Sequence, residues 1–252
     1  MKKVLSLVLA LVMALSLCTS AWATGEAGTG EGTGATAGTG AGGESGESGS
    51  GENGGETGTT YVAQIGETEY VTLQAAIDAA KRNDTVKLLT DTEENVTIST
   101  RDLTLDLNGH TLNGGTVAGK PALTVTARGV TVKDSSAAQT GTIMREDTAE
   151  NSGVSSHYVI DIQGNAWVIF ESGTVKNGSG AGGTKGASLV RVGDDSVKKQ
   201  PGLVINGGTF TQDNFIVIKV ARGYLTLNGG TLNSANSYAV ENWFRATIKG
   251  GT

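Results

Sequence analysis

The chain has 252 residues, including 39 Gly and one Cys, and a formal net charge of −6. The two lysines near the start contribute +2 and residues 24–59 contribute −6, so residues 60–252 carry only −2. This nearly neutral part shows no run of basic residues and no basic amphipathic helix, so neither nucleic acid nor a membrane surface is expected as a partner. Its length is enough for the core of one domain.

Residues 1–23 have the organisation of a secretory signal peptide. Lys2 and Lys3 precede an apolar run over 4–17, and Ala21-Trp22-Ala23 fits a small-x-small cleavage site. An uncleaved anchor is the alternative, but the run is shorter than the roughly 20 residues that cross a bilayer. Cys18 also permits a lipoprotein reading, although Leu17 is larger than the residue expected before a lipidated cysteine. Cleavage removes the only cysteine, so we expect a secreted or cell-surface protein without disulfides or membrane insertion.

Residues 24–59 are predicted to form a disordered, acidic linker. The segment contains 15 Gly and 6 Glu, with no Lys, Arg or large apolar residue. Such a composition cannot bury enough apolar surface to offset the entropy cost of ordering.

Residues 60–84 are predicted to form an N-terminal cap made of a hairpin and a helix. YVAQIG and TEYVT suggest the hairpin, and Leu73, Ala76, Ile77 and Ala80 share one face of a helix. Thr72 is the expected N-cap. A strand over 85–89 should then begin the main fold.

Residues 85–252 repeat one pattern at intervals of 21 to 35 residues, typified by LVINGGTF at 203–210 and LTLNGGTL at 225–232. The other copies are LDLNGHTL (105–112), VTVKDSSAAQTGTI (130–143), VIFESGTV (168–175) and ATIKGGT (246–252). A second set of short β-branched runs lies at 122–126, 158–162, 188–192, 215–220 and 238–240. The period and the Gly-bounded strands predict an all-β fold, a parallel β-helix of about six coils.

Equivalent residues of a β-helix stack into columns. The first expected inward column is Leu105, Val130, Val168, Leu203, Leu225 and Ala246, and the second is Leu107, Val132, Phe170, Ile205, Leu227 and Ile248. A third is Leu112, Ile143, Val175, Phe210 and Leu232. The expected polar column at the corner is Asn108, Lys133, Glu171, Asn206, Asn228 and Lys249, with an Asn206–Asn228 ladder and a Lys133–Glu171 pair. Gly109, Gly207, Gly229 and Gly250 are expected to take positive φ.

The segment VAQIGETEYVTLQAAIDAAKRNDTVKLLTD followed by LTLDLNGHTL resembles the start of right-handed β-helix (pectin lyase-like) regions of secreted Gram-positive bacterial surface proteins. The resemblance implies a right-handed helix, export and a modular surface protein. The chain stops in mid-coil at Thr252, which suggests truncation at the C-terminus or an uncapped last coil available for self-association.

The candidate binding residues are Tyr158, Asp161, Trp167, Arg191, Lys219 and Glu241. The charged members are expected to point outward from the second strand row, and the aromatic members offer faces on which sugars stack. Long loops at 113–122, 144–157 and 176–187 should extend this surface. No catalytic residue, cofactor or metal site is assigned from the sequence.

Three functions remain open. The first is a non-catalytic module for adhesion, with a polysaccharide or a host or cell-surface component as its partner. The second is a structural spacer or a self-assembling surface element. The third is a polysaccharide lyase or glycoside hydrolase, because the known enzymes of the resembled fold act on acidic polysaccharides.

Overall fold

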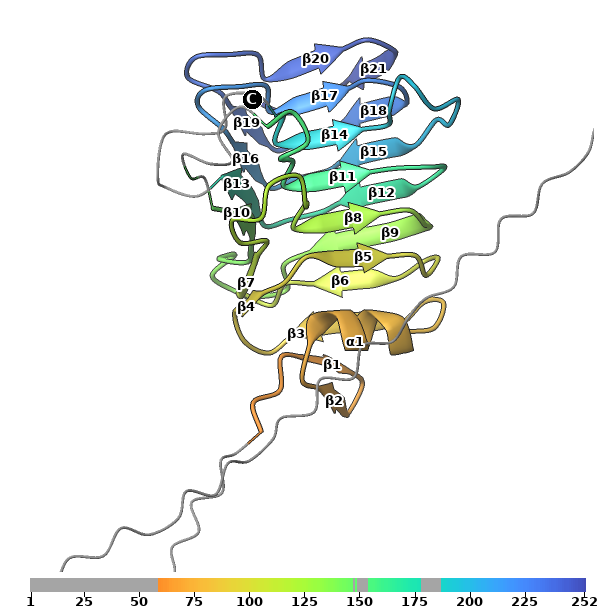
Figure 1. Ribbon diagram of the computed structural model, residues 1–252, viewed down its shortest axis with the longest axis vertical. Coiled ribbons are helices and arrows are strands. Elements are labelled where there is room, and N and C mark those ends of the chain that lie inside the picture. The colour runs from red at the N-terminus through yellow and green to blue at the C-terminus, as the bar shows by residue number, and fades with distance from the viewer. Residues whose placement is uncertain (1–58, 147, 149–153, 178–186) are drawn as a thin grey trace, which may run out of the picture. The chain divides into compact units, whose positions relative to one another are not determined.

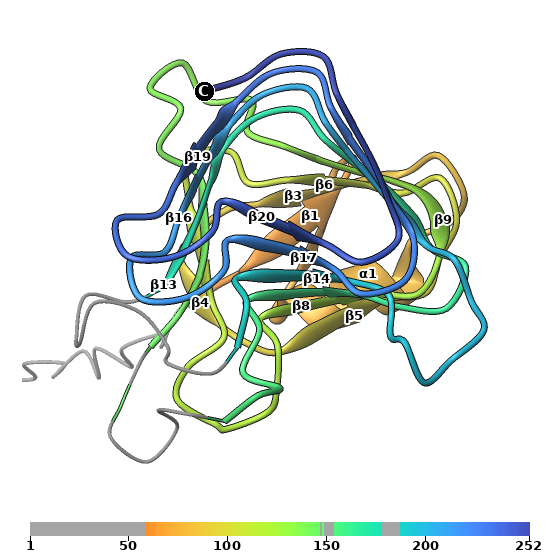
Figure 2. The same cartoon turned by 90° about the horizontal axis from the view of Figure 1, so that it is seen from above.

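The computed structural model describes residues 59–146, 148, 154–177 and 187–252. The predicted signal peptide and all but the last residue of the predicted linker lie outside these residues. Within them the chain forms a right-handed parallel β-helix with three walls, which we call sheets A, B and C. Figures 1 and 2 show the coils stacked along one axis, with the single helix of this part at one end.

Sheet A has the order β2-β1-β3-β6-β9-β12-β15-β18-β21. Its strands are β1 Ala63–Ile65, β2 Thr68–Tyr70, β3 Thr85–Leu88, β6 Thr104–Asp106, β9 Arg128–Lys133, β12 Trp167–Phe170, β15 Gly202–Ile205, β18 Tyr224–Leu227 and β21 Arg245–Ile248. Every strand after β3 is parallel to its neighbours, whereas β1 is antiparallel to both β2 and β3.

Sheets B and C have six strands each and are parallel throughout. Sheet B contains β4 Thr92–Glu93, β7 Thr111–Asn113, β10 Thr142–Arg145, β13 Thr174–Asn177, β16 Thr209–Thr211 and β19 Thr231–Asn233. Sheet C contains β5 Val96–Ile98, β8 Leu123–Val125, β11 Ile160–Ile162, β14 Val190–Val192, β17 Ile218–Val220 and β20 Val240–Asn242. The described strands therefore make six complete coils and the first strand of a seventh, in agreement with the predicted number.

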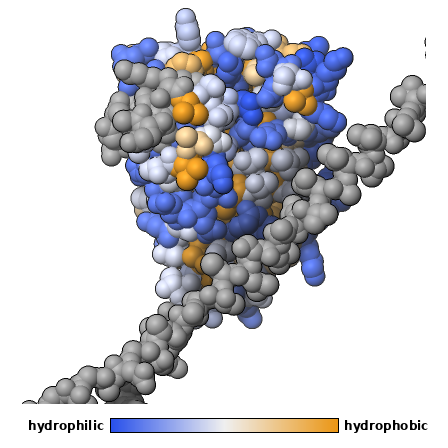
Figure 3. All heavy atoms as spheres, in the orientation of Figure 1, coloured by the Kyte–Doolittle hydropathy of each residue, from blue (hydrophilic) through white to orange (hydrophobic). Residues whose placement is uncertain are grey.

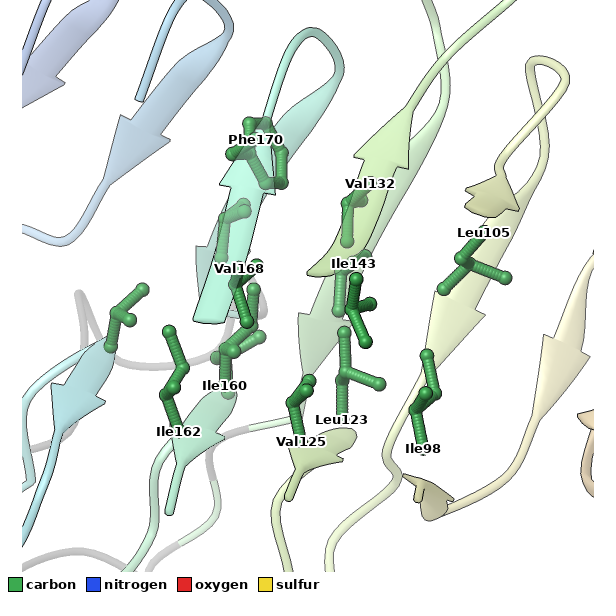
Figure 4. Close-up of a cluster of buried hydrophobic side chains, with 14 of the residues drawn as sticks. Ile98, Leu105, Leu123, Val125, Val132, Ile143, Ile160, Ile162, Val168 and Phe170 are labelled. Atoms are coloured by element: carbon green, nitrogen blue, oxygen red, sulfur yellow. The ribbon is translucent and has the colours of Figure 1, made fainter. Parts of the chain in front are cut away.

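The core is the space between the three walls, and it is filled by the alternate inward residues of every coil. Figure 4 shows Val132, Ile143 and Ile160 pointing from the three different walls toward this space. In the middle coils the inward residues are almost completely buried, and the Phe170 and Phe210 rings lie 4.7 Å apart between centroids. The face in Figure 3 carries mainly hydrophilic side chains with scattered hydrophobic ones. No helix within the described residues is long and apolar enough to cross a membrane.

The first two predicted columns are correct from the third coil onward and wrong by two positions in the second coil. The third predicted column is confirmed at every position, from Leu112 to Leu232. Leu105 lies opposite Val132 rather than Val130, so it belongs to the column of Phe170 and Ile205. Leu107 is still fully buried but lies beyond the end of β6, at the corner. The corner after Val132 contains additional residues, and the Asp134 carboxylate accepts backbone hydrogen bonds there from Gly109, Ser136 and Gly141. Because of this extra segment, the sheet A strands of the second and third coils pair two positions away from the predicted register, whereas the sheet B strands pair as predicted. The alignment of the repeats does not show this difference.

The same shift changes the polar column at the corner. Asp106, not Asn108, lies beside Lys133, with 3.7 Å between carboxylate and ammonium, so the expected Lys133–Glu171 pair is replaced by a Lys133–Asp106 pair. The Asn ladder is confirmed: Asn228 donates to Asn206 at 2.8 Å, and Asn206 donates to Glu171 at 2.9 Å.

The two glycines of each NGGT corner have different physical roles. Positive φ occurs at Gly109, as expected, but at Gly208 (85°) rather than Gly207. A Cβ on Gly207 would lie 2.6 Å from the carbonyl oxygen of Glu171 in the preceding coil. The first glycine thus permits close approach of successive coils, and the second permits the left-handed turn. Gly229 and Gly250 repeat the role of Gly207, so the expectation of positive φ at all three was wrong.

The cap closes the first coil by supplying hydrogen-bond partners to its open edges. Helix α1 (Leu73–Ala79) begins at Thr72, whose hydroxyl accepts from the Ala75 N–H at 3.1 Å, as predicted. Glu94 accepts from the Leu73 and Gln74 N–H groups. The Gln74 amide accepts from the Thr97 N–H at 2.7 Å and donates to the Thr97 carbonyl at 3.2 Å, so it pairs with the edge of β5 as a neighbouring strand would.

Paired substitutions in β15 test the register. Ile205→Ala removes a fully buried inward side chain and is expected to lower the free energy of unfolding by about 2–5 kcal/mol. Val204→Ala, on the outward position beside it, is expected to cost about 1 kcal/mol or less. Chemical denaturation of both variants measures the difference, and equal losses would contradict the inward assignment of Ile205.

Candidate functional site

The predicted charged residues form a column on the outer face of sheet C. The register places Thr124, Asp161, Arg191, Lys219 and Glu241 on successive strands β8, β11, β14, β17 and β20. The alternation of β-strands points them away from the core, because Ile160 and Ile162 on either side of Asp161 face inward. We call this set the sheet C column. The expected outward position of its charged members is therefore confirmed.

Arg191 is the centre of the most ordered part of the column. Its Nε and Nη2 donate to the two carboxylate oxygens of Asp161 at 2.8 and 2.7 Å, and its Nη1 donates to Asp194 at 2.9 Å. Asp161 is only 3% exposed and also accepts from Gln163 at 2.6 Å. Two carboxylates with several charge-assisted hydrogen bonds hold the guanidinium in one orientation.

The protonation states of this cluster follow from its contacts. Burial disfavours the charged form of Arg191, but the hydrogen bonds and charge of Asp161 outweigh burial and raise the pKa of the guanidinium. Hydrogen bonds from the Ser196 hydroxyl and N–H, assisted by Arg191, lower the pKa of Asp194. The arginine and Asp194 are therefore charged at neutral pH.

The far end of the column combines a second ion pair with an exposed aromatic ring. Lys219 Nζ lies 3.5 Å from Glu241 and 3.8 Å from the centroid of the Trp243 ring. Trp243 is 55% exposed, and the cation–π contact with Lys219 fixes its position. Because one lysine contacts both groups, the ring is oriented by the column itself.

A cleft of about 430 Å³ opens beside Arg191, at the corner that leads from sheet C to sheet A. It is lined by Gln163, Gly164, Arg191, Gly193, Asp194, Val197, Lys199 and Pro201. Concave sites with a few oriented polar groups are the usual places for small ligands. The cleft offers two cationic donors, one carboxylate acceptor, one side-chain amide and two apolar side chains, which suits a polar ligand such as a sugar.

Five of the six predicted binding residues lie on or beside sheet C, and one does not. Tyr158 is only 9% exposed, and its ring packs under the Arg191 guanidinium at 4.7 Å, so it supports the arginine and offers no free stacking face. Trp167 is on β12, in sheet A, and is not brought together with the others. One corner of the coil separates β12 from β11, so Trp167 faces outward from a different wall.

Sequence reasoning missed several residues of the cleft and column. It assigned no role to Asp194 or Lys199, yet Asp194 binds Arg191 and Lys199 lines the cleft. The signal that marks Asp194 is the Asp-x-Ser spacing to Ser196, which is typical of a side chain that orders its own turn.

The predicted binding loops are only partly described. Residues 147, 149–153 and 178–186 lie outside the described residues, so the 144–157 and 176–187 loops are untested as a shared surface. The 113–122 loop is described, and its Val117 carbonyl accepts a hydrogen bond from the buried Arg145. In the part of the chain that the structure describes, no group of three or more His, Cys, Asp or Glu is arranged to hold a metal ion.

His157 is a buried histidine at the start of the segment that leads into β11. Burial, together with the nearby positive charge of Arg145, lowers its pKa to about 4, although a contact with the Glu146 carbonyl opposes this shift. The folded protein therefore holds this imidazole neutral at pH 6, where an unfolded chain would largely protonate it.

This difference predicts acid sensitivity. A folded-state pKa below the unfolded value of 6.5 means that the contribution of His157 to stability is complete above pH 6.5 and decreases as the pH falls toward 4. Between pH 7 and pH 5 the loss should be about 2 kcal/mol. The measurement is the free energy of unfolding of the wild type and of His157→Gln across this range. Parallel pH profiles for the two proteins would contradict the shift.

A second prediction separates the two carboxylates that contact Arg191. Asp161→Asn removes the charge from a buried pair and should lower the free energy of unfolding by about 2–3 kcal/mol. Asp194→Asn changes a more exposed partner of the same arginine and should cost less than about 1 kcal/mol. Denaturant titration measures the free energy of unfolding of both variants. A larger loss for Asp194→Asn than for Asp161→Asn would contradict the assignment of Asp161 as the main partner of Arg191.

Comparisons with known proteins do not assign this chain to a family. The chain matches no protein-family model, and no curated protein or solved structure shows significant similarity to it.

Proposed function

We propose that this chain is an exported, non-catalytic β-helix module that binds a glycan or another polar surface component through the outer side of sheet C. The observation that carries the proposal is the cleft beside Arg191, whose guanidinium is held in place by Asp161 and Asp194. A donor with a fixed orientation at the wall of a cleft loses little entropy when a ligand binds. Export itself rests on the sequence pattern of residues 1–23.

The rest of the sheet C column supports a carbohydrate as the ligand. Sugars present hydroxyl groups at the ring edge and apolar C–H groups at the ring face. Carboxylate, amide and ammonium groups line or border the cleft, and Trp243 is an exposed ring on the same side of the molecule. Arg191 lies on β14 and is held by two carboxylates, which gives this donor a rigidity that an unsupported loop side chain lacks.

The test is a glycan array probed with the purified chain, followed by affinity measurements on two variants. Lys199→Ala removes an ammonium group from the wall of the cleft and is expected to weaken binding of the selected glycan by about fivefold. Lys198→Ala is the matched control, because it makes the same charge change one residue away and outside the lining of the cleft. Equal affinities of the two variants for the glycan would contradict binding at the cleft.

Self-association is the second candidate function. The four residues of β21 are all exposed, and the inward-type side chain of Ile248 is 64% exposed. An uncovered strand edge with an apolar residue is a site where another strand can add. Sedimentation of the chain over a range of concentrations, with Ile248→Lys as the comparison, tests it. Assembly by the wild type alone would favour a spacer or self-assembling role.

An enzymatic role is the third candidate, and it depends on the proposed relation to pectin lyase-like β-helix regions of Gram-positive surface proteins. The Asn ladder and the capped parallel coils support that relation. Incubation of the purified chain with pectin-like polysaccharides, followed by assays for unsaturated and reducing sugar ends, tests the activity directly.

A further inference from the structure

The outer face of sheet A carries a second set of chemically distinctive residues, separate from the cleft. The register places Arg128, Trp167, Gly202, Tyr224 and Arg245 on successive strands in one column. Four steps of about 4.8 Å between strands give the column a length of about 19 Å. Arginines therefore stand at both ends of an aromatic segment that follows the axis of the β-helix.

Gly202 allows the Trp167 ring to lie flat on the sheet. A Cβ on Gly202 would lie only 2.4 Å from Cε3 and Cζ3 of the indole, so the ring occupies the space above this glycine. The next ring, Tyr224, is 6.3 Å from Trp167 between centroids and is held by a 2.8 Å hydrogen bond from its hydroxyl to Gln200. Both rings are partly exposed, and together they form a low platform on the outer side of the wall.

Guanidinium groups surround this platform. Arg128 Cζ lies 5.9 Å from the Trp167 centroid, and Arg245 Cζ lies 5.8 Å from the Tyr224 centroid. Arg222 Cζ lies 5.7 Å from the ring of Phe244, which itself packs edge-on against Tyr224. Arg101 joins Arg128 and Trp167 in lining a cleft of about 250 Å³ at the other end. We call these seven residues the arginine–aromatic strip: Arg101, Arg128, Trp167, Arg222, Tyr224, Phe244 and Arg245.

The charge of the strip is not balanced within the described residues. None of them places a carboxylate within 4 Å of the four arginines of the strip, and the nearby Asp102 is already paired with Arg82 at 2.6 Å. The Nε group of Arg222 is buried and has no hydrogen-bond partner among the described residues. The sheet C column is different, because each of its cations contacts a carboxylate.

We propose that the arginine–aromatic strip binds a linear anionic polysaccharide, laid along the β-helix axis. The rings of Trp167 and Tyr224 pack against sugar faces, and the arginines at the two ends contact the acidic groups, which are carboxylates or sulfates. Guanidinium groups match the geometry of both anions. The folded part of the chain is slightly acidic as a whole, so the local concentration of cations reflects a specific surface rather than general basicity. A single-stranded nucleic acid is the competing occupant of such a surface.

The experiment measures binding of the purified full chain to four immobilised polymers. They are heparin for sulfate, polygalacturonate for carboxylate, dextran as a neutral glycan, and a single-stranded oligonucleotide. The expected result is binding to heparin or polygalacturonate that weakens steeply with added salt, with little binding to dextran. Preference for one of the two glycans identifies the acidic group.

Two variants locate the site. Arg128→Gln with Arg245→Gln should weaken binding by roughly tenfold. Lys176→Gln with Lys198→Gln makes the same charge change at exposed positions outside the strip and the cleft, and should leave binding unchanged. Gly202→Ala keeps every charge and both rings but lifts the indole from the sheet, and should weaken binding severalfold. A near-native denaturation curve for each variant shows that the fold is retained.

Other outcomes overturn the proposal. Equal binding to dextran would remove the role of charge, and stronger binding to the oligonucleotide would replace the glycan with a nucleic acid. Unchanged affinity in the Arg128 and Arg245 variant would place the binding elsewhere. The Arg128 and Arg245 variant tests binding at the strip, and Lys199→Ala tests binding at the cleft of sheet C. The two proposals can therefore fail independently of each other.

Discussion

The structure depends on one constraint: each strand must pair with the strand one coil earlier at the spacing of a parallel ladder. That spacing leaves no room for a Cβ where the corners of successive coils approach, which is why a glycine precedes the left-handed turn at Gly208 and at Gly230. The same spacing stacks like residues on like residues. The aliphatic columns form the core, and Asn206 and Asn228 share a hydrogen bond. The fold is therefore held by repeated contacts between neighbouring coils, with the Gln74 amide completing the pairing at the cap.

Stacking also explains the form of the candidate sites. A residue type placed outward in consecutive coils becomes a line of side chains along the axis, not an isolated group. On sheet C the line is Asp161, Arg191, Lys219 and Glu241, in which acids and bases neutralise one another and fix Arg191 beside the cleft. On sheet A the line is aromatic and cationic, without matching carboxylates among the described residues. Two walls of one scaffold thus present surfaces of different chemistry, each arranged as a line of side chains along the axis.

Several features of the candidate sites were beyond the reach of sequence reasoning for identifiable reasons. The inward and outward positions of β11, β14 and β17 followed from alternation, so Asp161, Arg191 and Lys219 were recognised as one row. The role of Tyr158 was not, because only the packing of the arginine over its ring decides that it is buried. Trp167 was predicted only as an exposed stacking face, and it lies on β12, one corner away from β11. Its relation to Gly202, 35 positions later, arises only when the coils stack.

The sequence by itself determined the parallel β-helix, the number of coils and the helix-and-hairpin cap, because a period of about 22 residues with alternating apolar positions is compatible with few other folds. It also determined the register wherever successive repeats have equal length, as between β15 and β18. Only the tertiary structure decided the register of β6, which pairs with β9 two positions away from the register that the repeats predict. The longer corner around Asp134 accommodates this difference without changing the repeat pattern. The tertiary structure likewise decided which charges are paired and which remain free, because ion pairing depends on distances between coils that the order of residues does not contain.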